Sequence, residues 1–261
     1  MQFSANLGFL WNELSLSEAI RAAARAGFDA VECHWPYETP AEQIASALEE
    51  TGLSMLGLNT SRGKAGENGL AALPGREADA RAAIDQAIEY AVAIQAQSIH
   101  VMAGIASGPD AHHSFCNNLY YACSRAAPHG LTILIEPLNP YDAPGYFLNT
   151  AQQAADIIQE LCLPQLRLMF DCYHQQITGG DVYRTFKRLL PIIGHVQMAS
   201  IPARTRPDEG ELDYGYTLSR IGALGWSRPI GAEYRTMGPT EQTLGWMADY
   251  KAIRIHEPSR D

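Results

Sequence analysis

The chain has 261 residues, of which 46% are hydrophobic and 18% are charged, and its formal net charge is −10. This composition excludes a disordered chain, because enough apolar side chains are present to build a core. The excess of acidic over basic residues excludes nucleic acid or an anionic membrane surface as the expected partner, since both bind proteins through clustered Lys and Arg.

Short apolar segments rich in β-forming residues alternate with longer helical patterns along the chain. The run Thr132-Ile133-Leu134-Ile135 is apolar on both faces, which is typical of a strand in a parallel sheet covered on both sides. Eight strands are predicted in this way, at residues 3–7, 30–33, 54–58, 98–102, 132–136, 166–171, 194–197 and 230–233.

The segments between these strands have the spacing of amphipathic helices. Apolar residues recur every three or four positions in residues 77–94, which predicts one helical face packed on the sheet. Residues 15–26 end at Gly27, a residue suited to a helix C-cap. Residues 150–161 begin with a threonine, a good N-cap, and stop before Pro164. Strand and helix alternating eight times predict either a closed barrel or a doubly wound sheet.

The turn after the first predicted strand decides between these two folds. A doubly wound nucleotide-binding sheet needs a glycine-rich turn there, whereas this chain has Gly8-Phe9-Leu10-Trp11 and contains no GxxxxGK[ST] sequence. A barrel needs about 250 residues, which matches the length. We therefore predict an α/β fold, a single (β/α)8 TIM barrel spanning residues 1–261. The long loops at 59–76 and 199–214 follow strands and would lie at its catalytic face.

The cysteines and the N-terminal segment indicate the compartment. The chain has five cysteines and no CxxC pair, which predicts a reduced, intracellular protein without a disulfide framework. No basic segment followed by a long apolar stretch opens the chain, so we expect no signal peptide and a cytoplasmic location. No run of about 18 apolar residues is present, which predicts no membrane span. These features leave self-association into a homo-oligomer open.

Four consecutive predicted strands end in a polar side chain that could bind a metal. A carboxylate at the end of an apolar strand is costly to desolvate unless it is paired or bound to a cation. Neighbouring strands of a barrel direct such ends toward one place above its centre. Three carboxylates and an amide oxygen suit a divalent metal, Mg²⁺ or Mn²⁺. The alternative is that each residue caps its strand or pairs with a nearby arginine. The predicted ligands are Glu136, Asp171, Gln197 and Glu233.

Histidines near these strand ends are further candidates. His174 follows Asp171 by three residues and could bind the metal, donate a hydrogen bond to a substrate, or support a ligand. His195 alternates with Gln197, so both side chains should point to the same side of the strand. His100 lies within a predicted strand, where the alternative is a buried core residue without a functional role.

Two arginines in the loop after the seventh predicted strand indicate an anionic substrate. Arg204 and Arg206 would lie over an acidic metal site, where a guanidinium needs an anion and suits a carboxylate in bidentate geometry. We expect both to bind a substrate carboxylate. The alternative is an ion pair within the loop, to Asp208 or Glu209.

Several short segments, spread in order over nearly the whole chain, match one family pattern. The segments are Phe3-Ser4-Ala5-Asn6-Leu7, Pro74-Gly75-Arg76-Glu77, Ile135-Glu136-Pro137-Leu138-Asn139, Asp142-Ala143-Pro144-Gly145-Tyr146, Asp171-Cys172-Tyr173-His174, Gly194-His195-Val196-Gln197-Met198-Ala199, Pro202-Ala203-Arg204, Gly210-Glu211-Leu212-Asp213-Tyr214 and Gly231-Ala232-Glu233-Tyr234. With these segments the chain resembles the hydroxypyruvate isomerase family of the xylose-isomerase-like barrels.

The resemblance implies a metal-dependent isomerase. It implies the same four ligands that the strand ends indicate, and a double role for Glu136 and Glu233 as the catalytic acid/base pair. The implied reaction interconverts hydroxypyruvate and tartronate semialdehyde (2-hydroxy-3-oxopropanoate) through an enediolate. The expected substrate is thus a small carboxylated hydroxy-oxo acid. The candidate substrate-binding residues are His174, Arg204, Arg206 and His195.

Several alternatives stay open at this point. Relatives of the resembled family act on four-carbon 2-oxo-acids or epimerise ketoses, with the same metal and glutamate pair. A neutral ketose would not need the two arginines. A metal-dependent endonuclease of similar barrel shape would need a basic groove, which the acidic composition disfavours. A non-catalytic binding protein would tolerate the loss of one glutamate, whereas both are present.

Overall fold

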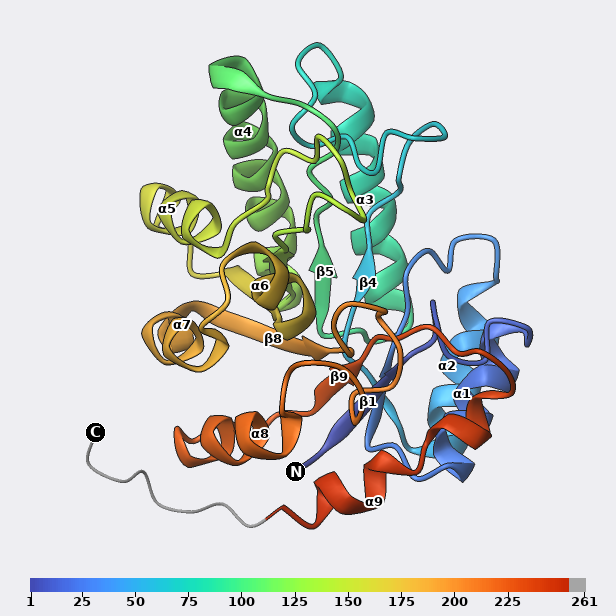
Figure 1. Ribbon diagram of the computed structural model, residues 1–261. Helices are drawn as coiled ribbons and strands as arrows, with labels where there is room; N and C mark the ends of the chain where they lie inside the picture. The colour runs from blue at the N-terminus through green and yellow to red at the C-terminus, as the bar shows by residue number, and fades with distance from the viewer. Residues whose placement is uncertain (254–261) are drawn as a thin grey trace.

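The structure is a computed structural model that describes residues 1–253. Its centre is a curled sheet of parallel strands with helices around the outside (Figure 1). Within the described part, nine strands lie in the order β3-β2-β1-β9-β8-β7-β6-β5-β4. They are β1 Phe3–Asn6, β2 Ala30–Glu32, β3 Ser54–Met55, β4 Leu58–Asn59, β5 Ser98–His100, β6 Thr132–Ile135, β7 Leu166–Asp171, β8 Ile193–Met198 and β9 Ile230–Ala232.

The sheet closes through one chain segment that belongs to both of its edges. β3 and β4 stand at opposite ends of the strand order, yet only Leu56 and Gly57 separate them in the sequence. The Leu56 N–H donates to the Val31 carbonyl (2.7 Å), and the Leu56 carbonyl accepts the Ser98 hydroxyl (2.6 Å). The predicted TIM-barrel fold is therefore confirmed, and the predicted strand 54–58 is divided where the chain passes from one neighbouring strand to the other.

Helices follow the strands and cover the outside of the sheet. They are α1 Leu16–Arg25, α2 Ala41–Thr51, α3 Glu77–Ala93, α4 Gly108–Ala126, α5 Ala151–Leu161, α6 Cys172–Thr178, α7 Val182–Leu189, α8 Tyr214–Ala223 and α9 Trp246–Lys251. α1 begins with a capping box, in which Ser15 and Glu18 bond each other's backbone N–H groups. Thr150 accepts the Gln153 N–H at the start of α5, as its sequence predicts. Among residues 1–253, no helix combines the length and apolar character that crossing a membrane requires.

Polar side chains lie inside the barrel, below the ends of the strands. Glu32, the last residue of β2, is buried and accepts hydrogen bonds from Gln197 (3.2 Å) and Asn6 (3.3 Å). The His195 ring nitrogen Nε2 contacts the same carboxylate. Gly231 on β9 makes room for it, because a Cβ at this position would lie 2.4 Å from Glu32 Oε1. The interior therefore depends on a glycine that faces a buried glutamate.

The Gly231→Ala substitution tests this packing. The added methyl group would overlap the Glu32 carboxylate, and overpacking of this kind costs about 1–3 kcal/mol, which lowers the melting temperature by several degrees. Gly238→Ala is the control, because a Cβ there meets open space. Thermal unfolding followed by circular dichroism measures both variants, and equal melting temperatures would refute the packing argument.

Candidate active site

A cavity of about 210 Å³ opens at the carboxyl ends of the strands. Because the paired strands are parallel, the segments that follow them meet at this end of the barrel. Ionisable side chains from both halves of the chain line the cavity. They are His34, Arg62, His100, Glu136, Asp142, His174, Arg204, Glu233 and Arg235.

Three buried side chains from β7 and its neighbours meet beside this cavity. Glu136 directly follows β6, Asp171 ends β7, and His174 lies in the first turn of α6. Asp171 Oδ1 accepts the Tyr173 N–H (2.8 Å) and so caps α6, which leaves Oδ2 for other partners. His174 Nε2 lies 3.6 Å from Asp171 Oδ2 and 3.9 Å from Glu136 Oε1. The structure therefore brings two of the predicted ligands together with the predicted histidine.

Several oxygen atoms of this group have no hydrogen-bond partner among residues 1–253. A buried polar atom without a partner costs about 1–3 kcal/mol, so such atoms indicate a ligand. Gln197 is paired in register with Asp171, and its amide nitrogen donates to Glu32, which fixes the orientation of the amide. The unpartnered oxygens are Glu136 Oε1, Asp171 Oδ2 and Gln197 Oε1. This donor set fits a divalent cation that prefers oxygen, such as Mg²⁺ or Mn²⁺.

The hydrogen bonds of His174 indicate which ring nitrogen carries its proton. The Asn139 N–H donates to Nδ1 (3.0 Å), so the neutral ring holds its proton on Nε2. Burial lowers the pKa of His174 to about 3, which keeps the ring neutral in neutral solution. His174 therefore presents an N–H toward the acidic group, and this suits hydrogen bonding to an oxygen better than it suits metal ligation.

Glu233 follows β9 and is surrounded by hydrogen-bond donors. Its Oε1 accepts from Asn6 Nδ2 (3.0 Å) and lies 3.0 Å from His34 Nε2, and its Oε2 accepts from Arg204 Nη2 (2.5 Å). Burial alone would raise the pKa of the Glu233 carboxyl. The charge of Arg204 and the contact with His34 outweigh burial and lower this pKa to about 2.

The two glutamates have pKa values displaced in opposite directions. Burial raises the pKa of Glu136 well above its usual value, and the negative charges of Glu233 and Asp171 raise it further. Burial also raises the pKa of Asp171 to about 7. With no cation bound, burial and the neighbouring negative charges therefore favour the protonated form of Glu136, while Arg204 favours the ionised form of Glu233. Carboxyl groups displaced in this way are typical of an acid/base pair.

Arg204 is buried at the centre of this charge cluster. Its backbone adopts a left-handed conformation, with φ of 55°. Its guanidinium lies 4.8 Å from the ring centre of Phe9 and 4.9 Å from that of Tyr173. Nη1 lies 3.3 Å from Asp142 Oδ2, while Nη2 binds Glu233. Two rings and two carboxylates thus hold the guanidinium in the cavity, where the sequence predicts it.

Two predicted substrate-binding residues lie away from the cavity. Arg206 binds Asp208 through Nε (2.7 Å) and lies 3.5 Å from Glu209, which is the alternative ion pair that the sequence left open. His195 points into the barrel, as its position in the strand predicts, but it contacts Glu32 below the site. Neither side chain lines the cavity, so the structure does not support a substrate contact of Arg206 or His195.

Several residues of the site come from the first half of the chain, and of these the sequence prediction includes His100 but misses Glu32 and His34. Glu32 ends an apolar strand, which is the same signal that identifies the later residues and could have identified this one. His34 lies close to the main chain at Gly8, where a Cβ would lie 2.1 Å from its ring. His100 Nδ1 lies 3.5 Å from Glu136 Oε2, and burial lowers the pKa of His100 to about 4.

Known proteins of one family are similar to this chain over nearly its whole length. The family model described as xylose isomerase-like TIM barrel matches residues 20–254. A 2-oxo-tetronate isomerase from Cupriavidus necator is 44% identical over 95% of this chain and 98% of its own length. A "Putative hydroxypyruvate isomerase" from Homo sapiens is 40% identical over 98% of this chain and 97% of its own. The crystal structure of an AP endonuclease, family 2, from Brucella melitensis superposes with a TM-score of 0.92 at 39% identity, covering 95% of this chain and 98% of that one. The chain therefore belongs to the xylose isomerase-like TIM barrel family, and these two relatives are named isomerases.

Proposed function

We propose that this protein is a divalent-metal-dependent isomerase of a small sugar acid, which moves a carbonyl group between adjacent carbons. Its proposed reaction is the interconversion of hydroxypyruvate and tartronate semialdehyde. A four-carbon 2-oxo-tetronate is the second candidate, because a relative 44% identical carries that name. The observation that carries the proposal is the pair Glu136 and Glu233, which line one cavity and have oppositely displaced pKa values. A ketose epimerase is disfavoured, since a neutral sugar has no carboxylate that could replace Glu233 on the buried Arg204.

The metal site is proposed at Glu136, Asp171, Gln197 and Glu233. The unpartnered oxygens of the first three support this assignment, because each needs a partner and ligand atoms of Glu136 and Asp171 lie within 4.8 Å of each other. Mg²⁺ or Mn²⁺ bound there would polarise the substrate carbonyl and stabilise the charge of the enediolate. Asp171, whose raised pKa favours its protonated form in the metal-free protein, would release its proton on binding.

Arg204 is proposed to exchange one carboxylate partner for another. In the substrate-free protein its guanidinium binds Glu233. A substrate carboxylate offers an equivalent partner, and once it accepts the Nη2 hydrogen bond, the Glu233 carboxylate is released. Because the charge of Arg204 is the strongest influence that lowers the pKa of Glu233, its neutralisation by the substrate raises that pKa. Glu233 thereby becomes a stronger base at the moment when substrate is bound.

The proposed proton transfers use the two glutamates on a bound hydroxy-oxo acid. Glu233 accepts the proton from the hydroxyl-bearing carbon beside the carbonyl, the hydroxyl proton passes to the former carbonyl oxygen, and Glu136 delivers a proton to the former carbonyl carbon. The Nε2–H group of His174 donates a hydrogen bond to the substrate oxygen on which negative charge develops. In the reverse direction the glutamates exchange roles.

The Glu233→Gln substitution removes the proposed base while keeping the size of the side chain. An amide cannot accept the proton, so we expect isomerisation to fall by about 10²–10⁴-fold, the usual contribution of a general base. NMR in D₂O, on hydroxypyruvate and on 2-oxo-tetronate with added Mg²⁺ or Mn²⁺, measures the exchange of carbon-bound hydrogen. A native circular-dichroism spectrum is the control for folding, and near-normal exchange would rule out the role as base.

The Arg204→Met substitution tests the carboxylate anchor. A hydrogen bond to a charged group contributes about 1.5–3 kcal/mol, so its loss should raise KM by about 10–100-fold. Arg206→Met is the matched control and should leave KM nearly unchanged, because Arg206 binds Asp208 outside the cavity. Steady-state kinetics on hydroxypyruvate measure both variants. Equal losses in the two variants, or a gain of activity in Arg204→Met, would contradict the anchor.

The affinity for the metal should rise with pH around neutrality. Asp171 has a pKa of about 7 in the metal-free protein and must lose its proton to bind the metal. At a pH below this pKa, a metal ion that binds therefore displaces protons. Calorimetric titration with Mn²⁺ at about pH 6 and about pH 8, in buffers of different ionisation enthalpy, measures affinity and proton release. Asp171→Asn should weaken binding and reduce its pH dependence. Equal affinities of the native protein for Mn²⁺ at the two pH values would contradict the assignment of Asp171 as a metal ligand.

A further inference from the structure

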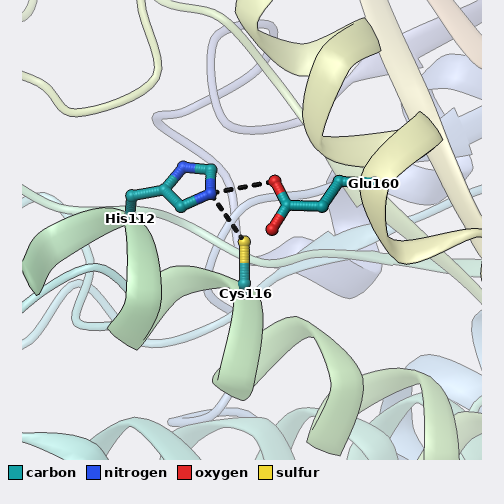
Figure 2. A group of neighbouring side chains, drawn as sticks. All are labelled: His112, Cys116 and Glu160. Atoms are coloured by element: carbon teal, nitrogen blue, oxygen red, sulfur yellow. Dashed lines mark hydrogen bonds and ion pairs between the residues drawn. The ribbon is translucent and has the colours of Figure 1, made fainter. Parts of the chain in front are cut away.

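A second group of ligand-type side chains lies in the helical layer, away from the cavity. His112 and Cys116 belong to α4 and Glu160 to α5. Figure 2 shows the His112 ring nitrogen facing both the Cys116 sulfur and the Glu160 carboxylate. His112 Nε2 lies 2.9 Å from Glu160 Oε2 and 3.5 Å from Cys116 Sγ. One ligand atom from each residue lies within 4.8 Å of the other two.

The spacing of His112 and Cys116 matches a tetrahedral metal site, whereas the 2.9 Å contact between His112 and Glu160 must lengthen to admit an ion. His112 and Cys116 are four residues apart on one helix, so their side chains are neighbours on the same face. Around a tetrahedral zinc ion, with bonds of about 2.0–2.1 Å to nitrogen and about 2.3 Å to sulfur, these two ligand atoms stand about 3.5 Å apart. The observed separation is 3.5 Å, so the helix already holds the pair at the required distance.

The three residues differ in burial, with a buried thiol beside a more exposed imidazole and carboxylate. Cys116 is only 8% exposed, whereas the side chains of His112 and Glu160 are 41% and 53% exposed. His112 Nε2 carries at most one hydrogen. It can bond the Cys116 thiol and the Glu160 carboxylate at the same time only if both share that hydrogen, which weakens both contacts. A cation between the three gives each of them a bond.

A reactive cysteine is the competing interpretation, and the surroundings of the thiol oppose it. A nucleophilic or readily oxidised cysteine needs a lowered pKa. Burial and the charge of Glu160 instead raise the pKa of Cys116 to about 11. The thiol is therefore protonated and inert in neutral solution until a metal displaces its proton.

We propose that His112, Cys116 and Glu160 bind a zinc-type divalent cation, with water as the fourth ligand. Thiolate and imidazole donors select Zn²⁺, whereas the oxygen-rich group in the cavity selects Mg²⁺ or Mn²⁺. On binding, the Cys116 sulfur forms a bond to the metal and its proton passes to solvent. The ion would link α4 to α5, which follow the strands that present His100 and Glu136 to the cavity.

Cobalt titration of the full chain tests the proposal. Co²⁺ replaces Zn²⁺ and gives a thiolate-to-metal charge-transfer absorption, which a site of oxygen and nitrogen donors cannot produce. The titration is made under reducing conditions with excess Mg²⁺, so that an oxygen-rich site is filled. We expect the band in the native protein, its loss in Cys116→Ser, and its retention in Cys162→Ser, whose exposed thiol lies outside the group.

Zinc competition against the cobalt signal supplies the second measurement. His112→Gln and the surface variant Glu160→Gln should each weaken Zn²⁺ binding by more than about tenfold, since even the loss of a supporting partner costs 10–100-fold. His113→Gln is the matched control, because His113 contacts Asn117 instead of the group. The proposal is overturned by the absence of the band in the native protein, by its persistence in Cys116→Ser, or by unchanged zinc affinity in Glu160→Gln.

Discussion

Buried negative charge at the ends of the strands is the constraint on which the site depends. Glu136, Asp171 and Glu233 are all buried, and each alters the electrostatic environment of the others. Like charges brought out of water cannot all stay ionised unless a cation joins them. The protein responds with the guanidinium of Arg204 beside Glu233 and with raised pKa values at Glu136 and Asp171, which favour their protonated forms. Both forms of compensation can be replaced. A bound metal can displace the protons, and a substrate carboxylate can take the place of Glu233 on Arg204.

The interior of the barrel supports these groups from below. The interior of a TIM barrel is usually filled by branched apolar side chains, whereas here Glu32 and its donors occupy it. Asn6 Nδ2 contacts both Glu32 (3.3 Å) and Glu233 (3.0 Å), so one amide joins the interior to the cavity. A polar layer of this kind stabilises a fold less than apolar packing would. It does orient the side chains above it, which indicates that function has shaped this part of the barrel.

The two groups of ligand-type side chains differ in the elements that hold them. The group in the cavity lies at strand ends, where the closed sheet fixes the backbone on both sides. The group formed by His112, Cys116 and Glu160 depends on two helices that contact each other on the outside of the barrel. A cation in the first group would act on a substrate, while one in the second would act on the packing of the two helices.

The sequence by itself determined the fold class and the main acidic residues of the site. Strand and helix periodicity are local properties, and a parallel barrel directs every strand end to one face, so Glu136, Asp171 and Glu233 could be placed there without coordinates. Only the tertiary structure separated Arg204 from Arg206. These residues share one irregular loop, and the left-handed backbone at Arg204 and the nearby Asp208 decide which guanidinium enters the cavity.

The tertiary structure alone also decided the contacts between distant segments. The position of Glu32 opposite Gly231 follows from how β2 and β9 flank β1. The meeting of Cys116 with Glu160 follows from how α4 packs beside α5. Local patterns report which face of an element is buried. They carry no information about which buried faces will touch, because that depends on how the sheet curls and closes.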